Sequence, residues 1–114
     1  MHPIERYRQL VQSIITDYTQ VPYAHGEVRF ETVTDCAADR YLLMLVGWEG
    51  IRRVHGCLIH VDIIDGKIWI QRDGTERGVA RDLLEAGVPR ERIVLAFRAL
   101  EAREAADLAE APAR

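Results

Sequence analysis

The sequence predicts an α+β domain, in which an N-terminal helix packs on a mainly antiparallel sheet of about five strands, with a second helix near 76–86 before a final strand. Three observations predict it. Apolar residues recur at helical spacing at the start of the chain, several strand-length apolar segments follow, and Asp65-Gly66 stands between two of them. With 114 residues, 48% of them apolar, the chain has the size and composition of a single globular domain.

The first element is an amphipathic helix that ends near Thr19. Pro22 prevents its continuation and favours an extended conformation at Val21. The apolar stripe of this helix consists of Ile4, Tyr7, Leu10, Val11, Ile14, Ile15 and Tyr18.

Two strands are expected next. From Glu27 to Thr34 apolar and charged residues alternate, as in a half-buried strand, and 35–39 is a turn. The run Tyr41–Trp48 is almost wholly apolar, which is typical of a strand buried on both faces. We expect strand 27–34 at the edge of the sheet. Because open edges invite pairing, we also expect a homodimer.

A long strand, Arg52–Ile64, leads into Asp65-Gly66, which favours a two-residue hairpin with positive φ at both central residues. This register predicts three pairs: Ile64 with Lys67, Ile63 with Ile68, and Val61 with Ile70. The apolar face that results is expected beneath the first helix. The opposite face then carries His60, Asp62, Trp69 and Gln71.

The last part of the domain is expected to contain a short helix and one strand. Thr75 is a candidate N-cap for the helix near 76–86, which ends at Gly87. A helical turn at Pro89-Arg90-Glu91 then precedes a strand at Ile93–Phe97. We therefore assign one domain to 1–104 and expect the Ala-rich tail, 105–114, to be frayed.

Charge and composition exclude several classes of protein. Fifteen basic residues face eighteen acidic ones, and Arg52-Arg53 is the only adjacent basic pair before residue 76, so strong direct DNA binding is not expected. Cys36 and Cys57 are too few for a disulfide scaffold and indicate a reducing compartment. Without a long apolar run or a signal peptide, the chain is expected to be cytoplasmic and to have no membrane partner.

One cluster suggests zinc: His55, Cys57, His60 and Asp62 form the pattern H-x-C-x-x-H-x-D. Strand alternation predicts that 55 and 57 face one side of the sheet and 60 and 62 the other, so these side chains cannot converge on one ion. The sequence also lacks a glycine-rich phosphate loop and a serine-nucleophile motif. We assign no metal, no cofactor and no catalytic residue.

The hairpin cluster is the candidate working surface. One interpretation is a partner-binding patch, because Trp is enriched at interface hot spots. The other is a solvated sheet face, on which Trp69 covers a neighbour and His60 pairs with Asp62. The residues assigned to partner binding are His60, Asp62, Trp69, Gln71 and Arg72.

Seven stretches spread over the chain match a known family: Tyr7-Arg8-Gln9, Val46–Glu49, Arg53–Cys57, His60–Ile63, Asp65–Glu76, Gly87–Pro89 and Ile93–Phe97. Through them the chain resembles the XisI family of excision-controlling factors over about residues 4–104. One departure is Arg98-Ala99-Leu100, which stands where the family has a His and a nearby Pro, and another is the Ala-rich tail.

The resemblance implies a non-enzymatic regulatory protein associated with programmed excision of a DNA element, such as the fdxN element of nitrogen-fixing cyanobacteria. It further implies a XisH-like, nuclease-type protein as the partner, and a separate site-specific recombinase complex that breaks and joins the DNA. Two alternatives stay open. One is a metal-dependent nuclease accessory that uses Asp62 or Asp65, and the other is a weak DNA-binding module.

Overall fold

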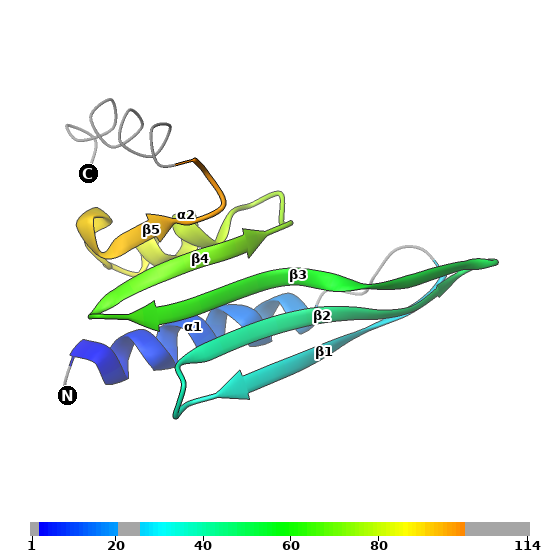
Figure 1. Cartoon of the computed structure of the whole chain (residues 1–114), viewed down its shortest axis with the longest axis horizontal. Helices are drawn as coiled ribbons and strands as arrows, with labels where there is room; N and C mark the ends of the chain where they lie inside the picture. The colour runs from blue at the N-terminus through cyan, green and yellow to red at the C-terminus, as the bar shows by residue number, and fades with distance from the viewer. Residues whose placement is uncertain (1–2, 21–25, 100–114) are drawn as a thin grey trace.

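The computed structural model describes residues 3–20 and 26–99, and it has the predicted α+β architecture. Helices α1 (Pro3–Thr19) and α2 (Val79–Glu85) cover one face of a five-stranded sheet (Figure 1). None of the helices in these two ranges is long and apolar enough to cross a membrane. The strands, in their order across the sheet, are β1 (Glu27–Asp35), β2 (Arg40–Glu49), β3 (Arg52–Ile64), β4 (Lys67–Asp73) and β5 (Ile93–Leu95).

Neighbouring strands are antiparallel from β1 to β4, and only the short β5 runs parallel to its neighbour, β4. Strand β1 therefore forms one edge of the sheet, as the sequence predicts. A 3-10 helix (Arg90–Arg92) turns the chain from α2 into β5. It corresponds to the helical turn expected after Pro89.

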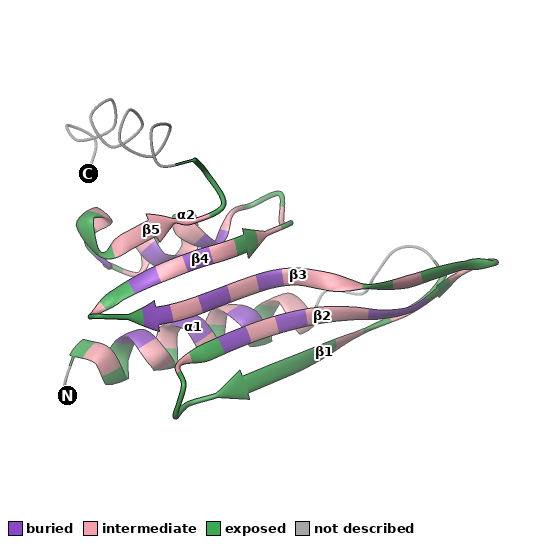
Figure 2. Cartoon of the chain, viewed as in Figure 1, coloured by how far each residue is buried: buried purple, intermediate pink, exposed green. Residues whose placement is uncertain are grey.

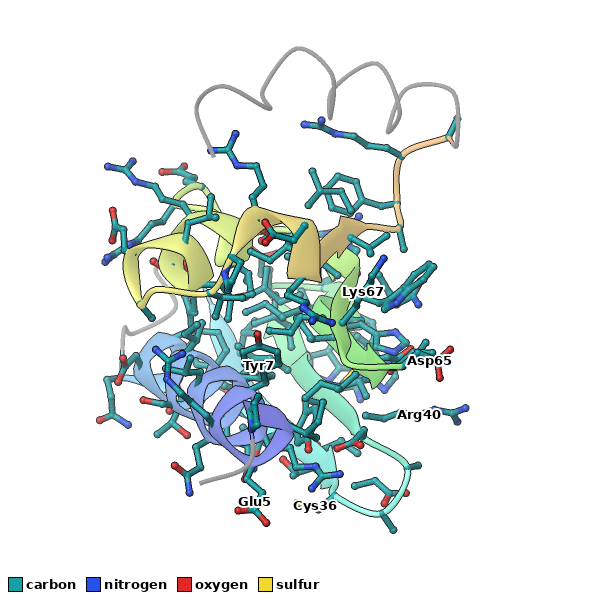
Figure 3. The ribbon with its side chains drawn as sticks, turned by 90° about the vertical axis from the view of Figure 1, so that its left-hand side faces the viewer. Glu5, Tyr7, Cys36, Arg40, Asp65 and Lys67 are labelled. Carbon is teal, nitrogen blue, oxygen red and sulfur yellow. The ribbon has the colours of Figure 1, made fainter. Side chains whose placement is uncertain are left out.

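The core lies between α1 and the sheet, and the predicted stripe of α1 fills it. Tyr7 points from α1 toward the strands (Figure 3) and is buried, as are Val11 and Ile15. The other stripe residues pack against the same cluster. On the sheet side the cluster includes the residues expected from the hairpin register: Val61, Ile63, Ile68 and Ile70.

The Asp65-Gly66 hairpin is confirmed residue by residue. Asp65 has φ 51° and Gly66 has φ 77°, the two positive values that a two-residue turn of this type requires. The register places Ile64 opposite Lys67 and carries the predicted pairs into both strands. The turn chemistry thus fixes which face of β3 and β4 meets the helices.

Strand β2 differs from its prediction. Tyr41 and Leu43 are fully buried on the helix side, but Leu42 and Met44 on the other side are only half-buried (Figure 2). No element in the described part of the chain forms a second layer there. A continuous apolar run therefore does not mean that both faces of this strand are covered.

Helix α2 begins at Val79, later than predicted, and Thr75 is not its N-cap. Gly78 stands at that position with φ 94°, a value outside the helical region. The Asp73 carboxylate accepts hydrogen bonds from the Val79 N–H at 2.8 Å and the Thr75 N–H at 2.9 Å, and Thr75 Oγ1 accepts one from the Gly78 N–H at 3.1 Å. This polar loop replaces the first predicted turn and satisfies the N–H groups of Gly78 and Val79, which an uncapped helix would leave without acceptors.

The C-terminal boundaries agree in part. Gly87 has φ 95° and follows the last turn of α2, as expected for a residue that ends a helix. Strand β5 ends at Leu95, two residues before the predicted boundary at Phe97, and a turn follows it. The tail at 105–114, predicted to fray, lies outside the described residues.

Candidate functional site

The candidate site lies on the sheet face that points away from α1 and α2, which we call the outer face. The pairing register of the strands shows which residues lie on the outer face, because residues paired across neighbouring strands share a face. His60 of β3 pairs with Leu42 of β2, and Asp62 pairs with Arg40 on one side and with Trp69 of β4 on the other. Arg40 is seen extending away from the helices in Figure 3. The hairpin cluster predicted from the sequence is therefore brought together.

Three of its polar side chains are joined by hydrogen bonds. The His60 Nε2 and Asp62 Oδ1 atoms are 2.9 Å apart, and the Gln71 amide donates to Asp62 Oδ2 at 3.3 Å. Both oxygens of the Asp62 carboxylate are thus engaged. The three side chains are half-buried, so they form a fixed polar surface beside the Trp69 ring.

A β-bulge in β3 corrects the predicted placement of the zinc-like cluster. Leu58 has no counterpart in β2, since Ile59 pairs with Leu43 and Cys57 pairs with Met44. Leu58 packs against the core together with Ile59. Alternation therefore restarts on the other side of the bulge.

Consequently the prediction that His55 and Cys57 face away from His60 and Asp62 is wrong, because all four occupy outer-face positions. They are nevertheless spread along the strand. At about 3.3 Å per residue, His55 and Asp62 lie roughly 20 Å apart along it. Among residues 3–20 and 26–99, no group of three or more His, Cys, Asp or Glu side chains is placed to hold a metal ion.

Arg72, the fifth predicted partner-binding residue, spans the bulge. A second irregularity, at Gln71 of β4, places Arg72 opposite His60. The Arg72 Nε–H donates to the Cys57 carbonyl at 3.3 Å, and the Gly74 N–H donates to the Leu58 carbonyl at 2.8 Å. These two bonds satisfy carbonyls that the bulge turns away from the ladder. Arg72 is therefore partly a structural residue.

Cys57 is a half-buried side chain of the outer face whose thiol is already hydrogen-bonded. Its Sγ–H donates to the Ile59 carbonyl at 3.1 Å, and burial raises the pKa of the thiol. Cys57 and the exposed Cys36 are both free cysteines.

The middle of the outer face is apolar, and its rim is basic along β2–β4 and mainly acidic along β1, where Glu27, Glu31 and Asp35 pair with outer-face residues of β2. Trp69 and Leu42 flank the polar cluster, and the apolar surface continues along β2 and into β5. Its members are Leu42, Met44, Val46, Trp69 and Val94, of which only Val46 is fully shielded by its neighbours. Four exposed cations of β2–β4 surround them: Arg40, Arg53, Lys67 and Arg72. On those three strands Asp62 is the one acidic residue at an outer-face position.

Sequence reasoning missed part of this face at the far end of β2 and β3. There Trp48 is 49% exposed, and the Arg53 guanidinium lies over its ring, 5.3 Å from the centroid. Ile51 in the connecting turn is fully exposed. The signal was present, because a two-residue turn after Glu49 requires Trp48 to pair with Arg53.

A cavity of about 420 Å³ between α1 and α2 is the main rival site. Its polar groups bind one another. The Tyr18 hydroxyl donates to Asp82 at 3.0 Å, and the Arg77 Nε lies 2.6 Å from the same carboxylate. Burial raises the pKa of the Tyr18 hydroxyl. The Tyr18–Asp82 bond joins α1 to α2, and Arg77, in the turn before α2, neutralises the same carboxylate. The polar groups of the cavity are therefore already paired, which leaves the outer face as the better candidate.

Comparisons with known proteins agree with the resemblance seen in the sequence. The family model described as XisI protein matches residues 1–110. A crystal structure of a XisI-like protein from Anabaena variabilis is 39% identical, with a TM-score of 0.81, over 88% of this chain and 92% of that one. The fdxN element excision controlling factor XisI from Anabaena variabilis is 31% identical, with a TM-score of 0.76, over 89% of this chain and 98% of that one. Among curated proteins, none matches.

Proposed function

The chain belongs to the XisI family, and from that membership we propose that it is a non-enzymatic accessory factor in the excision of a DNA element or in a related process. Its direct partner is a XisH-like, nuclease-type protein, and the pair serves a site-specific recombinase complex. One similar structure is that of an excision controlling factor, which supports a regulatory role. Two free cysteines support action in the cytoplasm.

The observation that carries this proposal is the outer face itself. The helix side of the sheet is filled by the core, whereas the other side leaves Trp69 and its apolar neighbours half-exposed beside a fixed polar cluster (Figure 2). A large aromatic next to ordered polar groups is the usual composition of an interface centre. The face is therefore suited to bind a protein.

The rim defines the chemistry of that partner. Arg40, Lys67 and Arg53 stand around the apolar centre, while the single acid among them, Asp62, is already bonded to His60 and Gln71. A complementary surface would have an apolar patch with carboxylates on the side that meets β2–β4, and few on the side that meets β1, where Glu27, Glu31 and Asp35 stand. Attraction between the two rims would mainly accelerate association and would weaken with added salt.

A titration with a XisH-like protein from the same organism tests the proposal. We expect wild-type binding that weakens as salt is raised, and a further loss of affinity in Arg40→Glu. The matched control is Arg81→Glu on α2, an exposed arginine on the opposite side of the molecule, which should bind like wild type. If the wild type does not bind, or if both charge reversals weaken binding equally, the outer face is not the binding surface.

A further inference from the structure

We propose that a second copy of this chain adds to the open edge of the sheet, with the two β1 strands antiparallel and paired about a two-fold axis at Phe30. Residues 27–33 of each copy would then form a ladder, and the two sheets would become one. The proposal concerns an edge of the molecule, and it does not depend on the partner proposed for the outer face.

The two edges of the sheet differ in how far they are protected against pairing with a strand of another molecule. Strand β5, at one edge, has three residues, and short edge strands are a common defence against pairing. Strand β1 has nine residues, pairs with β2 without a bulge and contains no proline. None of the described elements lies beyond it (Figure 1), and every residue from Glu31 to Asp35 is exposed. Its outward N–H and C=O groups form a long, regular template.

The charges on β1 select the register. In a symmetric antiparallel pair that keeps the two outer faces on one side, residues of the same parity must face each other, so the centre lies on a residue. Centres at Phe30, Glu31 or Thr32 give the longest ladders from a strand of this length. These are the three registers to compare.

Two of the three are unfavourable. A centre at Glu31 sets that carboxylate against itself and Glu27 against Asp35, and like charges directly opposite are destabilising. A centre at Thr32 sets Arg29 against Asp35, but Asp35 Oδ1 already accepts hydrogen bonds from the N–H groups of Ala37 and Ala38, both at 3.0 Å. The carboxylate that this register needs therefore already holds the β1–β2 turn.

A two-fold axis at Phe30 places opposite charges of the two β1 strands against each other. It sets Arg29 against Glu31 of the second copy, and the symmetry repeats that pair. Within one copy the Arg29 Nε and Glu31 Oε2 atoms are 2.8 Å apart, so the dimer would carry four alternating charges on one face. On the helix side the half-buried Phe30 would meet its own symmetry mate, an aromatic pair that favours strand association.

This arrangement has a consequence for the outer face. A two-fold axis perpendicular to the sheet leaves both outer faces on the same side of the dimer. Two copies of Trp69 and its rim would then be presented together. A partner with two binding surfaces could engage both, which would raise its apparent affinity without new contacts.

Charge reversal tests the register by sedimentation velocity. We expect the wild type to dimerise, and Arg29→Glu and Glu31→Arg each to raise the dimer dissociation constant by about tenfold or more, because each creates two like-charged pairs. The double variant restores opposite charges and should dimerise like wild type. A mixture of the two single variants should form the heterodimer, since one strand then presents only carboxylates and the other only guanidiniums. Both side chains are exposed, so each variant should melt like wild type.

Two outcomes would overturn the proposal. One is a wild-type chain that sediments as a monomer up to its solubility limit. The other is a Glu31→Arg variant that dimerises as tightly as wild type, because only the register centred on Phe30 places Glu31 against an arginine. Neither measurement involves the XisH-like protein, so failure here leaves the proposed function to its own test.

Discussion

Asp39 joins three parts of the fold through one side chain and one carbonyl. Its carboxylate accepts hydrogen bonds from Arg8 of α1 at 2.6 and 3.0 Å and from the Tyr41 hydroxyl of β2 at 2.9 Å. Its backbone carbonyl accepts from the Ile63 N–H at 2.9 Å. The residue has φ 54°, a conformation that Asp and Asn tolerate better than most residues. It fixes the β1–β2 turn against both the helix and the sheet.

This geometry predicts a pH dependence of stability. Hydrogen bonds from Arg8, followed by that from Tyr41, hold the pKa of the Asp39 carboxyl below its ordinary value. A carboxyl whose pKa is lower in the folded state contributes stability above about pH 4, and this is lost as the pH falls through the folded pKa. Asp39→Asn should therefore be less stable than wild type at pH 7 in urea unfolding, and the difference should shrink toward pH 3.

The matched control is Asp65→Asn. Asp65 is also an aspartate with positive φ, but it lies exposed in the hairpin turn (Figure 3). Its replacement leaves the contacts of Asp39 with Arg8 and Tyr41 in place, so the stability at pH 7 should stay close to that of wild type. An equal effect of the two substitutions would mean that turn conformation, and not the Arg8 contact, explains the loss.

At the scale of the element, β3 shows what the sequence could predict and what it could not. The hairpin at Asp65-Gly66 was predictable because two adjacent positive φ values demand particular residues, and the register then follows by counting. The bulge at Leu58 was not predictable, because an apolar residue at this position can lie on either face of the sheet. The contacts that stabilise it are tertiary, because the Arg72 side chain and the Gly74 N–H bind the carbonyls of Cys57 and Leu58.

The same distinction explains the candidate site. His60, Asp62 and Trp69 lie between the bulge and the hairpin turn, where alternation holds, and their common face was predicted correctly. Gln71 lies at the second irregularity, and its hydrogen bond to Asp62 joins it to the same cluster. His55 lies beyond the bulge and was assigned to the wrong face. The late start of α2 has a similar origin, since Asp73 binds the Val79 N–H from the end of a strand. The helix propensity of the residues near Thr75 gives no information on that contact.

Two neighbouring residues of β3 that point to opposite faces of the sheet provide a test of the face assignment. Ile63 is 7% exposed on the helix side, and its neighbour Ile64 is 42% exposed on the other. Ile63→Asp would bury an unpaired charge, which costs about 3 kcal/mol or more and should unfold the domain. Ile64→Asp should remain folded. Circular dichroism melts of the two variants check this, and a reversed order of stability would mean that the faces are assigned the wrong way round.

At the scale of the whole molecule, both helices lie on one side of the sheet (Figure 1). Trp69, Trp48 and the cations Arg40, Arg53 and Lys67 occupy positions on the other side. This one-sidedness permits a protein partner to cover the outer face without disturbing the core. It also leaves the edge strand β1 free to pair. The two surfaces do not overlap in the residues assigned to them, so both contacts can exist in one assembly.

Direct DNA binding should be weak. The apolar centre of the outer face separates the cations of its rim from one another, and the chain as a whole carries a net charge of −3. We expect fluorescence anisotropy with duplex DNA to show no saturable binding tighter than about 1 μM at physiological salt. Salt-sensitive affinity at that level or better would favour the DNA-binding alternative. Metal-dependent cleavage that is lost in Asp62→Asn or Asp65→Asn would favour the nuclease alternative.

The most direct test of the central claim, that a protein partner binds the outer face, is the affinity of Trp69→Ala for the XisH-like protein, measured by titration calorimetry beside a thermal melt. Truncation of a tryptophan at an interface centre commonly costs about 2 kcal/mol or more, which is a loss of affinity of about thirtyfold. We predict that loss together with a melting temperature within a few degrees of wild type. Affinity equal to wild type would contradict the claim. So would a loss of several kcal/mol in stability, since Trp69 would then be a core residue. The binding surface would then be sought around Arg81 of α2 and Arg77 in the turn before it.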